Sequence, residues 1–212
     1  MTPQEKYLHI LRRHLPAEAV DWVYHYADRH NLHLHVTRGR RSKLGDYRWP
    51  QPQHDFHEIS VNGDLNPYFF FWVFLHEAAH LEVHAKYAEH VAPHGHEWQA
   101  EYAGLLRQHV GSFPADARDL VSRYASRIPL QRRLFRQVEA VLHRYDKGFD
   151  PDALLPRLDN LPAGTLFRLK SNPKILFRSV ERRRTRWLCQ AVGTARQYTV
   201  SGTAEVLVEN EI

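Results

Sequence analysis

The sequence contains a single cysteine, Cys189, and a single methionine, Met1. One cysteine excludes a disulfide within the chain and any zinc ribbon built from several cysteines, and it is typical of a reducing compartment. The longest apolar run, residues 68–75, is much shorter than the roughly 18 residues of a membrane-spanning helix. The first residues also lack an apolar signal segment. We therefore expect a cytoplasmic protein without a membrane partner and, by default, a monomer.

Acidic residues are fewer than basic ones, 24 against 29, so the net charge is +5 and the isoelectric point is about 9.4. This excess makes a polyanion a plausible partner but does not identify one. The composition, 43% hydrophobic and 25% charged, is that of a folded protein and excludes a disordered chain. A length of 212 residues suffices for one compact domain and a small appendage.

Residues 1–147 have the pattern of an α+β domain. Apolar periodicity and the positions of proline and glycine predict helices over residues 3–14, 16–30, 97–109, 115–126 and 130–145. Alternating apolar residues predict strands over 32–37 and 58–61, and a basic loop with two glycines, 38–45, follows the first strand. A further helix begins at Pro67 and must end before Pro93. Because residues 68–75 are apolar on every side, we expect this helix to be buried.

The sequence pattern changes from helical periodicity to prolines and short β-like runs after residue 147. Residues 148–163 contain three prolines and are interpreted as a linker. From residue 164 to 212 short β-like runs alternate with turn residues, over 166–170, 174–180, 185–192, 198–200 and 204–209. This pattern predicts a small antiparallel β module, similar to an SH3-like barrel.

The stretch from His76 to His80 carries two histidines one helical turn apart, with Glu77 after the first. On a helix the two imidazoles lie on one face, roughly 6 Å apart along the axis, which allows them to share one Zn²⁺ ion. Glu77, one step around the helix, is placed to act as a general base toward a water molecule there. Burying these groups in so apolar a helix would cost several kcal/mol unless they are paired or bind a metal.

A catalytic zinc site needs a third protein ligand. His84 continues the spacing of four, but it lies about 12 Å along the helix axis from His76, too far for a shared ion. After Pro93 the chain can fold back toward the helix, so the residues that follow are better candidates: His94, His96, Glu97 and Glu101.

His76 to His80, followed after thirteen residues by His94-Gly95-His96-Glu97-Trp98, resembles the SprT-like (Spartan-like) zinc metalloprotease family. Ser42-Lys43-Leu44-Gly45 and the Asn62-Gly63 turn add to this resemblance, which covers roughly residues 5–110. It implies a zincin-like fold for the first domain, His94 as the third zinc ligand, and cleavage of proteins crosslinked to DNA. Two features depart from the family: His96 stands where relatives often have proline, and the cysteine-rich zinc ribbon of many bacterial members is absent.

Three further residues are candidates for supporting roles. Tyr102 or His96 could donate a hydrogen bond to the oxyanion of the reaction, and Glu101 is better placed to orient a ligand histidine than to bind zinc. Glu77 would accept a proton from water and deliver it to the leaving amine.

Two basic segments are candidates for contact with single-stranded or damaged DNA. The first includes Arg40, Arg41, Lys43 and Trp49. In the second, residues 164–196 hold nine Lys and Arg against one acid, a balance of 9 − 1 = +8, and the candidates are Arg178, Arg182, Arg183, Arg184, Arg186 and Trp187. Cations beside aromatic rings offer phosphate contacts and base stacking.

The sequence thus predicts a zinc endopeptidase acting on protein substrates associated with or crosslinked to DNA. Two alternatives stay open: a nucleic-acid-binding protein with a structural or idle zinc site, and a metallopeptidase that does not depend on nucleic acid.

Overall fold

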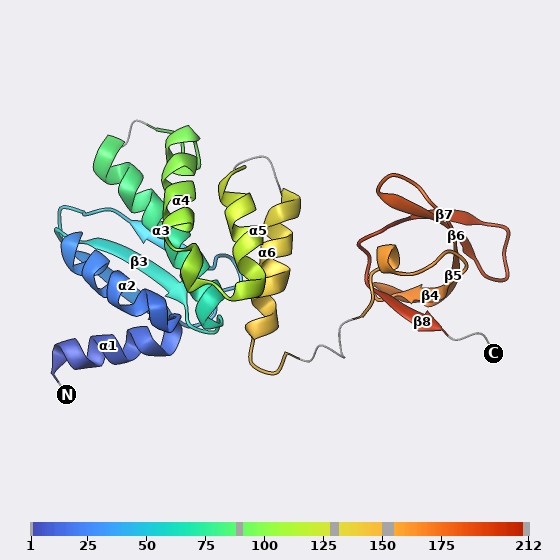
Figure 1. The fold of residues 1–212 in the computed structure, drawn as a ribbon, viewed down its shortest axis with the longest axis horizontal. Coiled ribbons are helices and arrows are strands. Elements are labelled where there is room, and N and C mark those ends of the chain that lie inside the picture. The colour runs from blue at the N-terminus through green and yellow to red at the C-terminus, as the bar shows by residue number, and fades with distance from the viewer. Residues whose placement is uncertain (1, 88–90, 128–131, 150–154, 210–212) are drawn as a thin grey trace. The chain divides into compact units, whose positions relative to one another are not determined.

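The computed structural model describes residues 2–87, 91–127, 132–149 and 155–209. The chain forms two compact units, residues 1–149 and 150–212, each with its own hydrophobic core (Figure 1). The described part contains six α-helices and two sheets, so the predicted α+β class is confirmed. No helix in this part has the length and apolarity needed to cross a membrane.

The first unit contains a three-stranded sheet with the strand order β1-β3-β2. Strand β1 (Leu32–Thr37) runs parallel to β3 (His57–Asn62), whereas β2 (Gly45–Arg48) runs antiparallel to β3. The sequence predicts β1 and β3 but not β2. Because β2 follows a basic loop and contains a glycine, its strand character comes from pairing with β3 rather than from its own composition.

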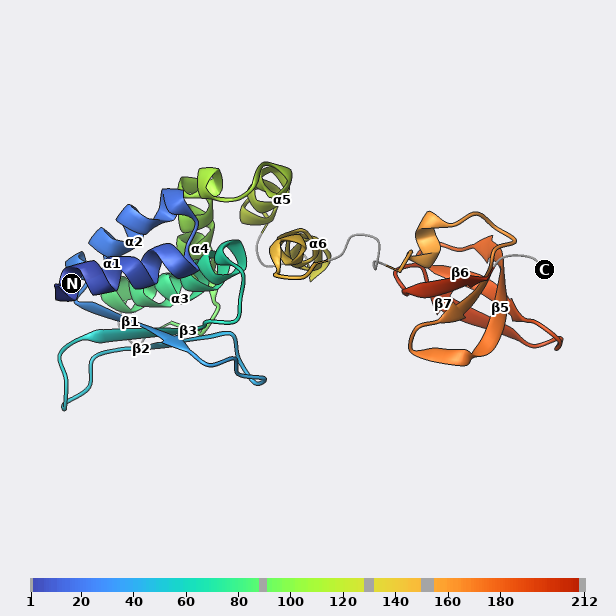
Figure 2. The ribbon, with the colours of Figure 1, turned by 90° about the horizontal axis from the view of Figure 1, so that it is seen from below.

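Helices α1 (Pro3–His14), α2 (Ala17–Arg29) and α3 (Pro67–Tyr87) lie on one face of this sheet (Figure 2). Helix α4 (His96–Gln108) packs on α3, α5 (Ala115–Ala125) on α4, and α6 (Arg132–Leu142) on α5. The predicted helices agree closely with these bounds, except that the last ends at Leu142 and a 3-10 turn, His143–Tyr145, follows it. Residues 130 and 131 of that prediction lie outside the described residues.

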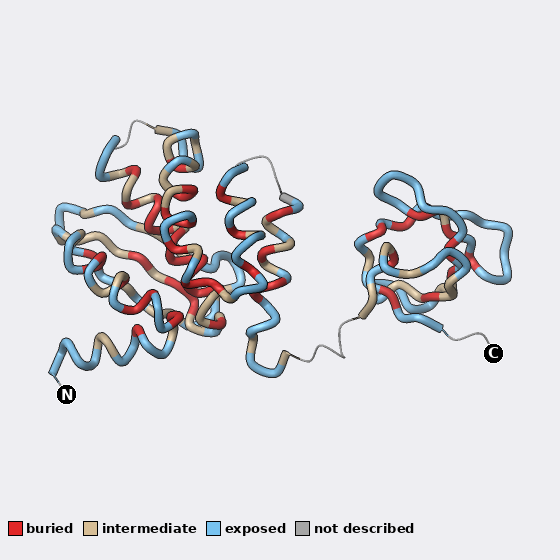
Figure 3. The backbone as a smooth tube through the Cα atoms, in the orientation of Figure 1, coloured by how far each residue is buried: buried red, intermediate tan, exposed pale blue. Residues whose placement is uncertain are grey.

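Helix α3 is the centre of the first unit (Figure 3), and every residue from Phe69 to Leu75 is buried. Its beginning is fixed by Asn66, whose side-chain oxygen accepts hydrogen bonds from the backbone N–H groups of Tyr68 and Phe69, at 3.1 and 3.0 Å. Each buried aromatic or aliphatic side chain contributes about 1.5–3 kcal/mol to folding. The helix that carries His76, Glu77 and His80 is therefore held firmly on most of its surface.

The second unit is a five-stranded antiparallel sheet with the order β7-β6-β5-β4-β8. Its strands are β4 (Leu166–Leu169), β5 (Asn172–Arg182), β6 (Arg186–Ala191), β7 (Gln197–Ser201) and β8 (Val206–Glu209). The core includes Phe167, Phe177 and Trp187. Leu158, within the stretch interpreted as a linker, is fully buried in this core, so the linker is shorter than 148–163.

Candidate metal centre

Three imidazoles converge at the surface of the first unit. Nε2 of His94 lies 3.1 Å from Nε2 of His76 and 3.1 Å from Nε2 of His80. His76 and His80 are partly buried on one face of α3, and His94 is exposed at the opening of the site. Within the described residues this is the one group of three or more ligating side chains found close enough together to hold a metal ion. The expected set of three histidines is therefore brought together.

His94 reaches this position through an unusual backbone conformation. Its φ of +56° lies in the left-handed region, which costs a residue other than glycine about 1 kcal/mol or more. Two hydrogen bonds stabilise the turn: the N–H of Gly95 donates to the carbonyl of Ala92 at 2.8 Å, and Nε2 of Gln99 donates to the carbonyl of His94 at 2.9 Å. Helix α4 begins two residues after His94, so this hydrogen bond joins the first turn of α4 to the backbone of His94.

Trp98 lies against all three imidazoles. Its ring centroid is 4.6 Å from that of His76, 5.4 Å from that of His80 and 4.5 Å from that of His94. Tyr102 lies beneath, with its ring centroid 5.5 Å from that of His76, and it is only 1% exposed. The indole N–H of Trp98 and the hydroxyl of Tyr102 are buried and have no hydrogen-bond partner among the described residues. The imidazoles thus rest on an aromatic floor that excludes water from one side.

This burial keeps the imidazoles neutral. Burial, together with the nearby His80 and His94, lowers the pKa of His76 to about 3. Burial and then His94 lower the pKa of His80 to about 4, and burial lowers the pKa of His94. A neutral imidazole has a nitrogen lone pair free for a metal, which a protonated one lacks.

Glu77 is buried beside the imidazoles, at 8% exposure. Burial raises the pKa of Glu77 to about 7; Asp46 acts in the same direction, whereas Arg40 and Lys43 oppose it. Strand β2 passes directly over this carboxylate, since a Cβ built on Gly45 would lie 2.5 Å from Oε1 of Glu77. Only glycine fits here without displacing the carboxylate. In the sequence, Gly45 belongs to the stretch Ser42–Gly45, but the sequence does not show that Gly45 lies against Glu77.

The loop before β2 is held by Asn62, which is 1% exposed. The side-chain N–H₂ of Asn62 donates to the carbonyls of Arg40 and Lys43, at 3.1 and 3.2 Å, and its oxygen accepts from Nε of Arg40 at 2.8 Å. Nη1 of Arg40 donates to the hydroxyl of Ser60 at 3.0 Å. The guanidinium of Arg40, one of the candidate DNA contacts, thus fastens the loop to β3.

The three candidates for supporting roles differ in their surroundings. The carboxylate of Glu101 accepts a hydrogen bond from Lys86 at 2.7 Å and has none with a histidine of the described ranges. Tyr102 is too deeply buried for its hydroxyl to reach a substrate. His96 is exposed in the first turn of α4. As expected, His84 does not join the three imidazoles; its ring contacts Trp49, with centroids 5.8 Å apart.

The remaining basic candidates divide by their surroundings. Lys43 pairs with Asp46 at 2.8 Å and Arg182 with Asp159 at 3.3 Å. Trp187 is 5% exposed and donates its N–H to Asp159 at 2.9 Å, so the expectation that it stacks on bases is wrong. Lys43 and Arg182 are nonetheless exposed, as are Arg41, Trp49, Arg178, Arg183, Arg184 and Arg186.

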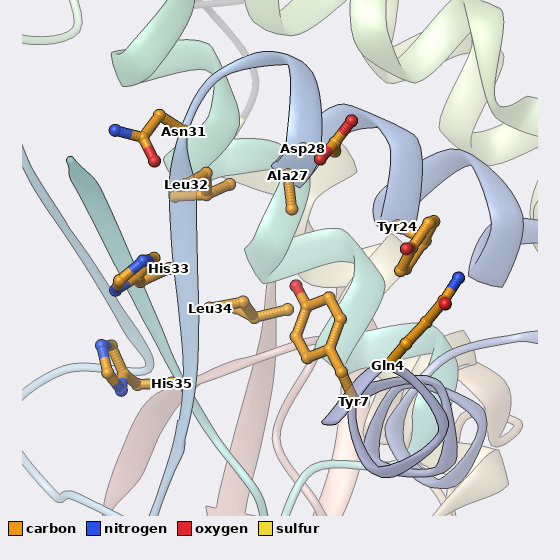
Figure 4. Close-up of a pocket in the computed structure, with 10 residues that line it drawn as sticks. All are labelled: Gln4, Tyr7, Tyr24, Ala27, Asp28, Asn31, Leu32, His33, Leu34 and His35. Atoms are coloured by element: carbon orange, nitrogen blue, oxygen red, sulfur yellow. The ribbon is translucent and has the colours of Figure 1, made fainter. Parts of the chain in front are cut away.

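A pocket of about 480 Å³ lies elsewhere in the first unit, between α1, α2 and β1 (Figure 4). Tyr7 and Leu34 point toward each other across it. The hydroxyl of Tyr7 is buried and finds no hydrogen-bond partner in the described part of the chain, and burial raises the pKa of Tyr7 to about 12. None of the three converging histidines lines this pocket.

Comparison of the chain with protein-family models, curated proteins and solved structures gives no match. The chemistry of the site is therefore argued from its geometry. Sequence reasoning missed Gln99 and Asn62, which act through backbone atoms. The sequence offers one signal for these two residues: the Asn62-Gly63 turn is part of the family resemblance described above.

Proposed function

We propose that the chain is a zinc-dependent endopeptidase that hydrolyses proteins held on DNA. The observation that carries this proposal is the convergence of His76, His80 and His94 beside the buried carboxylate of Glu77. Three nitrogens bound to one tetrahedral zinc at about 2.1 Å lie about 3.4 Å from one another. The 3.1 Å separations of the Nε2 atoms are close to that value. The donor set fits Zn²⁺ with one position left open.

A hydrolytic role explains Glu77 better than a structural role does. A structural zinc site is closed by four protein ligands, whereas the described residues supply three. Zn²⁺ bound here would supply Lewis-acid activation of a peptide carbonyl and of water. Glu77 would take the proton from the attacking water and pass it to the leaving amine. Trp98 and Tyr102 would shield the imidazoles from solvent and keep their orientation.

The architecture of each unit is compatible with this function. We propose a zincin-like fold for the first unit, in which β2 forms the edge of the sheet above the helix that carries the histidines. The second unit has four consecutive antiparallel strands and a fifth that returns beside the first, which supports an SH3-like module.

The DNA part of the proposal depends on the second unit. Arg183, Arg184 and Arg186 are exposed around the β5–β6 turn, and none forms an ion pair with a described residue. Unpaired arginines on a hairpin are suited to phosphate contacts. A protease carrying such a module would act on proteins near a polynucleotide.

The test is to measure zinc content and proteolysis of the full chain, with and without single-stranded DNA. The wild type should bind one zinc ion, His94→Ala should lose it, and Glu77→Gln should keep it but lose hydrolysis. Activity that requires DNA supports the full proposal, and DNA-independent activity retains the peptidase but removes its DNA dependence. Zinc without any proteolysis leaves a nucleic-acid-binding protein with an idle site. A wild type that binds no zinc would refute the proposal.

A further inference from the structure

An aromatic surface borders the metal centre. We call Tyr47, Trp49 and His84 the aromatic shelf. The ring of Tyr47 is nearly parallel to that of His80, at 4° with centroids 6.5 Å apart, and the ring of Trp49 is stacked on His84 at 14° and 5.8 Å. Trp49 is 44% exposed, which is high for so large an apolar side chain. The shelf thus runs from a zinc ligand out to solvent.

The position of the shelf follows from the path of β2 along α3. Gly45 lies against Glu77, Tyr47 against His80, and Trp49, beyond the end of β2, against His84. This chain of contacts follows α3 away from the proposed general base, about 1.5 Å per residue along the helix. An extended polypeptide with its scissile bond at the metal centre would therefore pass over Trp49 within a few residues of the cut.

Three polar side chains at the shelf, those of Lys43, Arg48 and Tyr47, have partners among the described residues. Lys43 and Arg48 both pair with Asp46, at 2.8 and 3.1 Å, and the hydroxyl of Tyr47 is hydrogen-bonded to Nδ1 of His57 at 2.9 Å. What the shelf offers a ligand is mainly the face of the Trp49 indole. This surface favours an uncharged ring or a large aliphatic side chain over a nucleotide, whose phosphates would need free cations.

We propose that the aromatic shelf is a specificity subsite, which binds an aromatic or large aliphatic side chain of the polypeptide substrate on one side of the scissile bond. This inference rests on the proposed peptidase function. A difference of a single methylene group in an apolar pocket changes kcat/KM by roughly 10- to 200-fold. Trp49→Ala should therefore reduce the preference for Phe or Leu over Ala at that position by at least 10-fold.

The experiment compares cleavage of a random peptide library by the zinc-loaded wild type, Trp49→Ala and Trp49→Phe. Ile10→Ala is the matched control, because Ile10 is equally exposed at 44% but lies on α1. The wild type and Ile10→Ala should show the same enrichment of aromatic or aliphatic residues at one position. Trp49→Ala should lose this enrichment while still cleaving peptides with alanine there, and Trp49→Phe should largely restore it. An unchanged preference in Trp49→Ala would overturn the proposal.

A binding arm separates this inference from the peptidase proposal. The same library is passed over immobilised zinc-loaded Glu77→Gln and over Glu77→Gln combined with Trp49→Ala. Retention of aromatic peptides that depends on Trp49 supports the subsite even if no variant cleaves anything. Equal retention by both proteins overturns it, and so does a result in which Trp49→Ala weakens binding of an oligothymidine while peptide selection is unchanged.

Discussion

Gln99 holds the third imidazole in place through one hydrogen bond, from its side-chain N–H₂ to the carbonyl of His94. Because the backbone of His94 is in the left-handed region, contacts with neighbouring groups must offset the free-energy cost of this conformation. Gln99→Ala should weaken zinc affinity by roughly 10-fold, as losses of such supporting contacts commonly do. Zinc titration against a competing chelator measures the affinity. Equal affinities in the two proteins would show that the turn holds His94 without Gln99.

His109 makes the stability of the first unit depend on pH. It is 8% exposed, its ring centroid lies 3.9 Å from that of Trp22, and no described residue forms a hydrogen bond with its Nε2. Burial lowers the pKa of His109 to about 4. The unfolded chain, with a histidine pKa of about 6.5, therefore binds the proton first as the pH falls. The stability contribution is complete above pH ~6.5 and is lost progressively between pH ~6.5 and ~4.

The variant His109→Gln removes this titrating group. Between pH 7.5 and pH 5.0, the free energy of unfolding of the wild type should fall by about 1–2 kcal/mol more than that of His109→Gln. Urea unfolding of the two full-length proteins at both pH values gives this difference. Parallel losses of stability would show that His109 is not protonated on unfolding.

Residue types and spacing predict the pair His76 and His80 but leave the third candidate ligand open, and the family resemblance is what indicates His94; the groups that hold these side chains could not be predicted. The helical repeat fixes His76 and His80 on one face whatever the rest of the chain does. Gln99 and Asn62 act on backbone carbonyls, and any polar residue in a sequence could do so. The same limit explains the error at Trp187, since an aromatic residue among arginines has the same pattern whether it faces solvent or the core.

Strand β2 brings a backbone segment against the proposed general base. In Gly45→Ala, the new methyl group would collide with Oε1 of Glu77 and with Cγ1 of Val73, at 2.5 and 2.7 Å, unless they move. Because the end of a glutamate side chain moves more easily than a strand, we expect the carboxylate to shift. Hydrolysis should fall by about 100-fold, as displacements of about 1 Å often cause. Zinc content should stay unchanged, and both are measured on the same preparation.

Gly104→Ala is the control for this substitution. Gly104 lies within α4, and a Cβ there meets no atom within 4 Å. It should keep full activity and gain about 0.5–1 kcal/mol in stability, because alanine favours a helix interior. If both variants lost activity equally, the contact between Gly45 and Glu77 would not be the cause.

Predicting a helix and predicting a strand from the sequence depend on different signals. Helix α3 could be predicted because proline at its start and a continuous apolar run are local signals. Strand β2 could not, because Gly45 to Arg48 becomes a strand only by pairing with Val61 to Glu58 of β3. The register between two distant strands cannot be predicted from the sequence of either strand alone.

Across the whole molecule, positive charge is divided between cations that stabilise the fold and cations that remain available. In the second unit, Arg168 pairs with Glu209 at 2.7 Å and Lys170 with Glu205 at 2.6 Å, across β4 and β8. Arg183 and Arg184 lie in the β5–β6 turn and are exposed. The balance of +8 over residues 164–196 therefore overstates the charge available to a polyanion, since acids outside that range, such as Glu205, neutralise part of it.

This division leads to a prediction about salt. If Arg183 and Arg184 contact phosphates, each contributes about 0.7 to the slope of log K against log salt for single-stranded DNA. Replacing both with glutamine should reduce the slope by about 1.4 and weaken binding most at low salt.

Replacing Arg168 and Lys170 with glutamine is the control. It removes the same charge, but these side chains are already paired, and surface pairs contribute about 0–1 kcal/mol to stability. Fluorescence anisotropy of a labelled oligonucleotide with the full-length variants, from 50 to 300 mM salt as an order-of-magnitude range, measures both slopes. If both double variants changed the slope equally, net charge rather than the hairpin would govern binding, and a wild type whose affinity did not respond to salt would exclude phosphate contacts altogether.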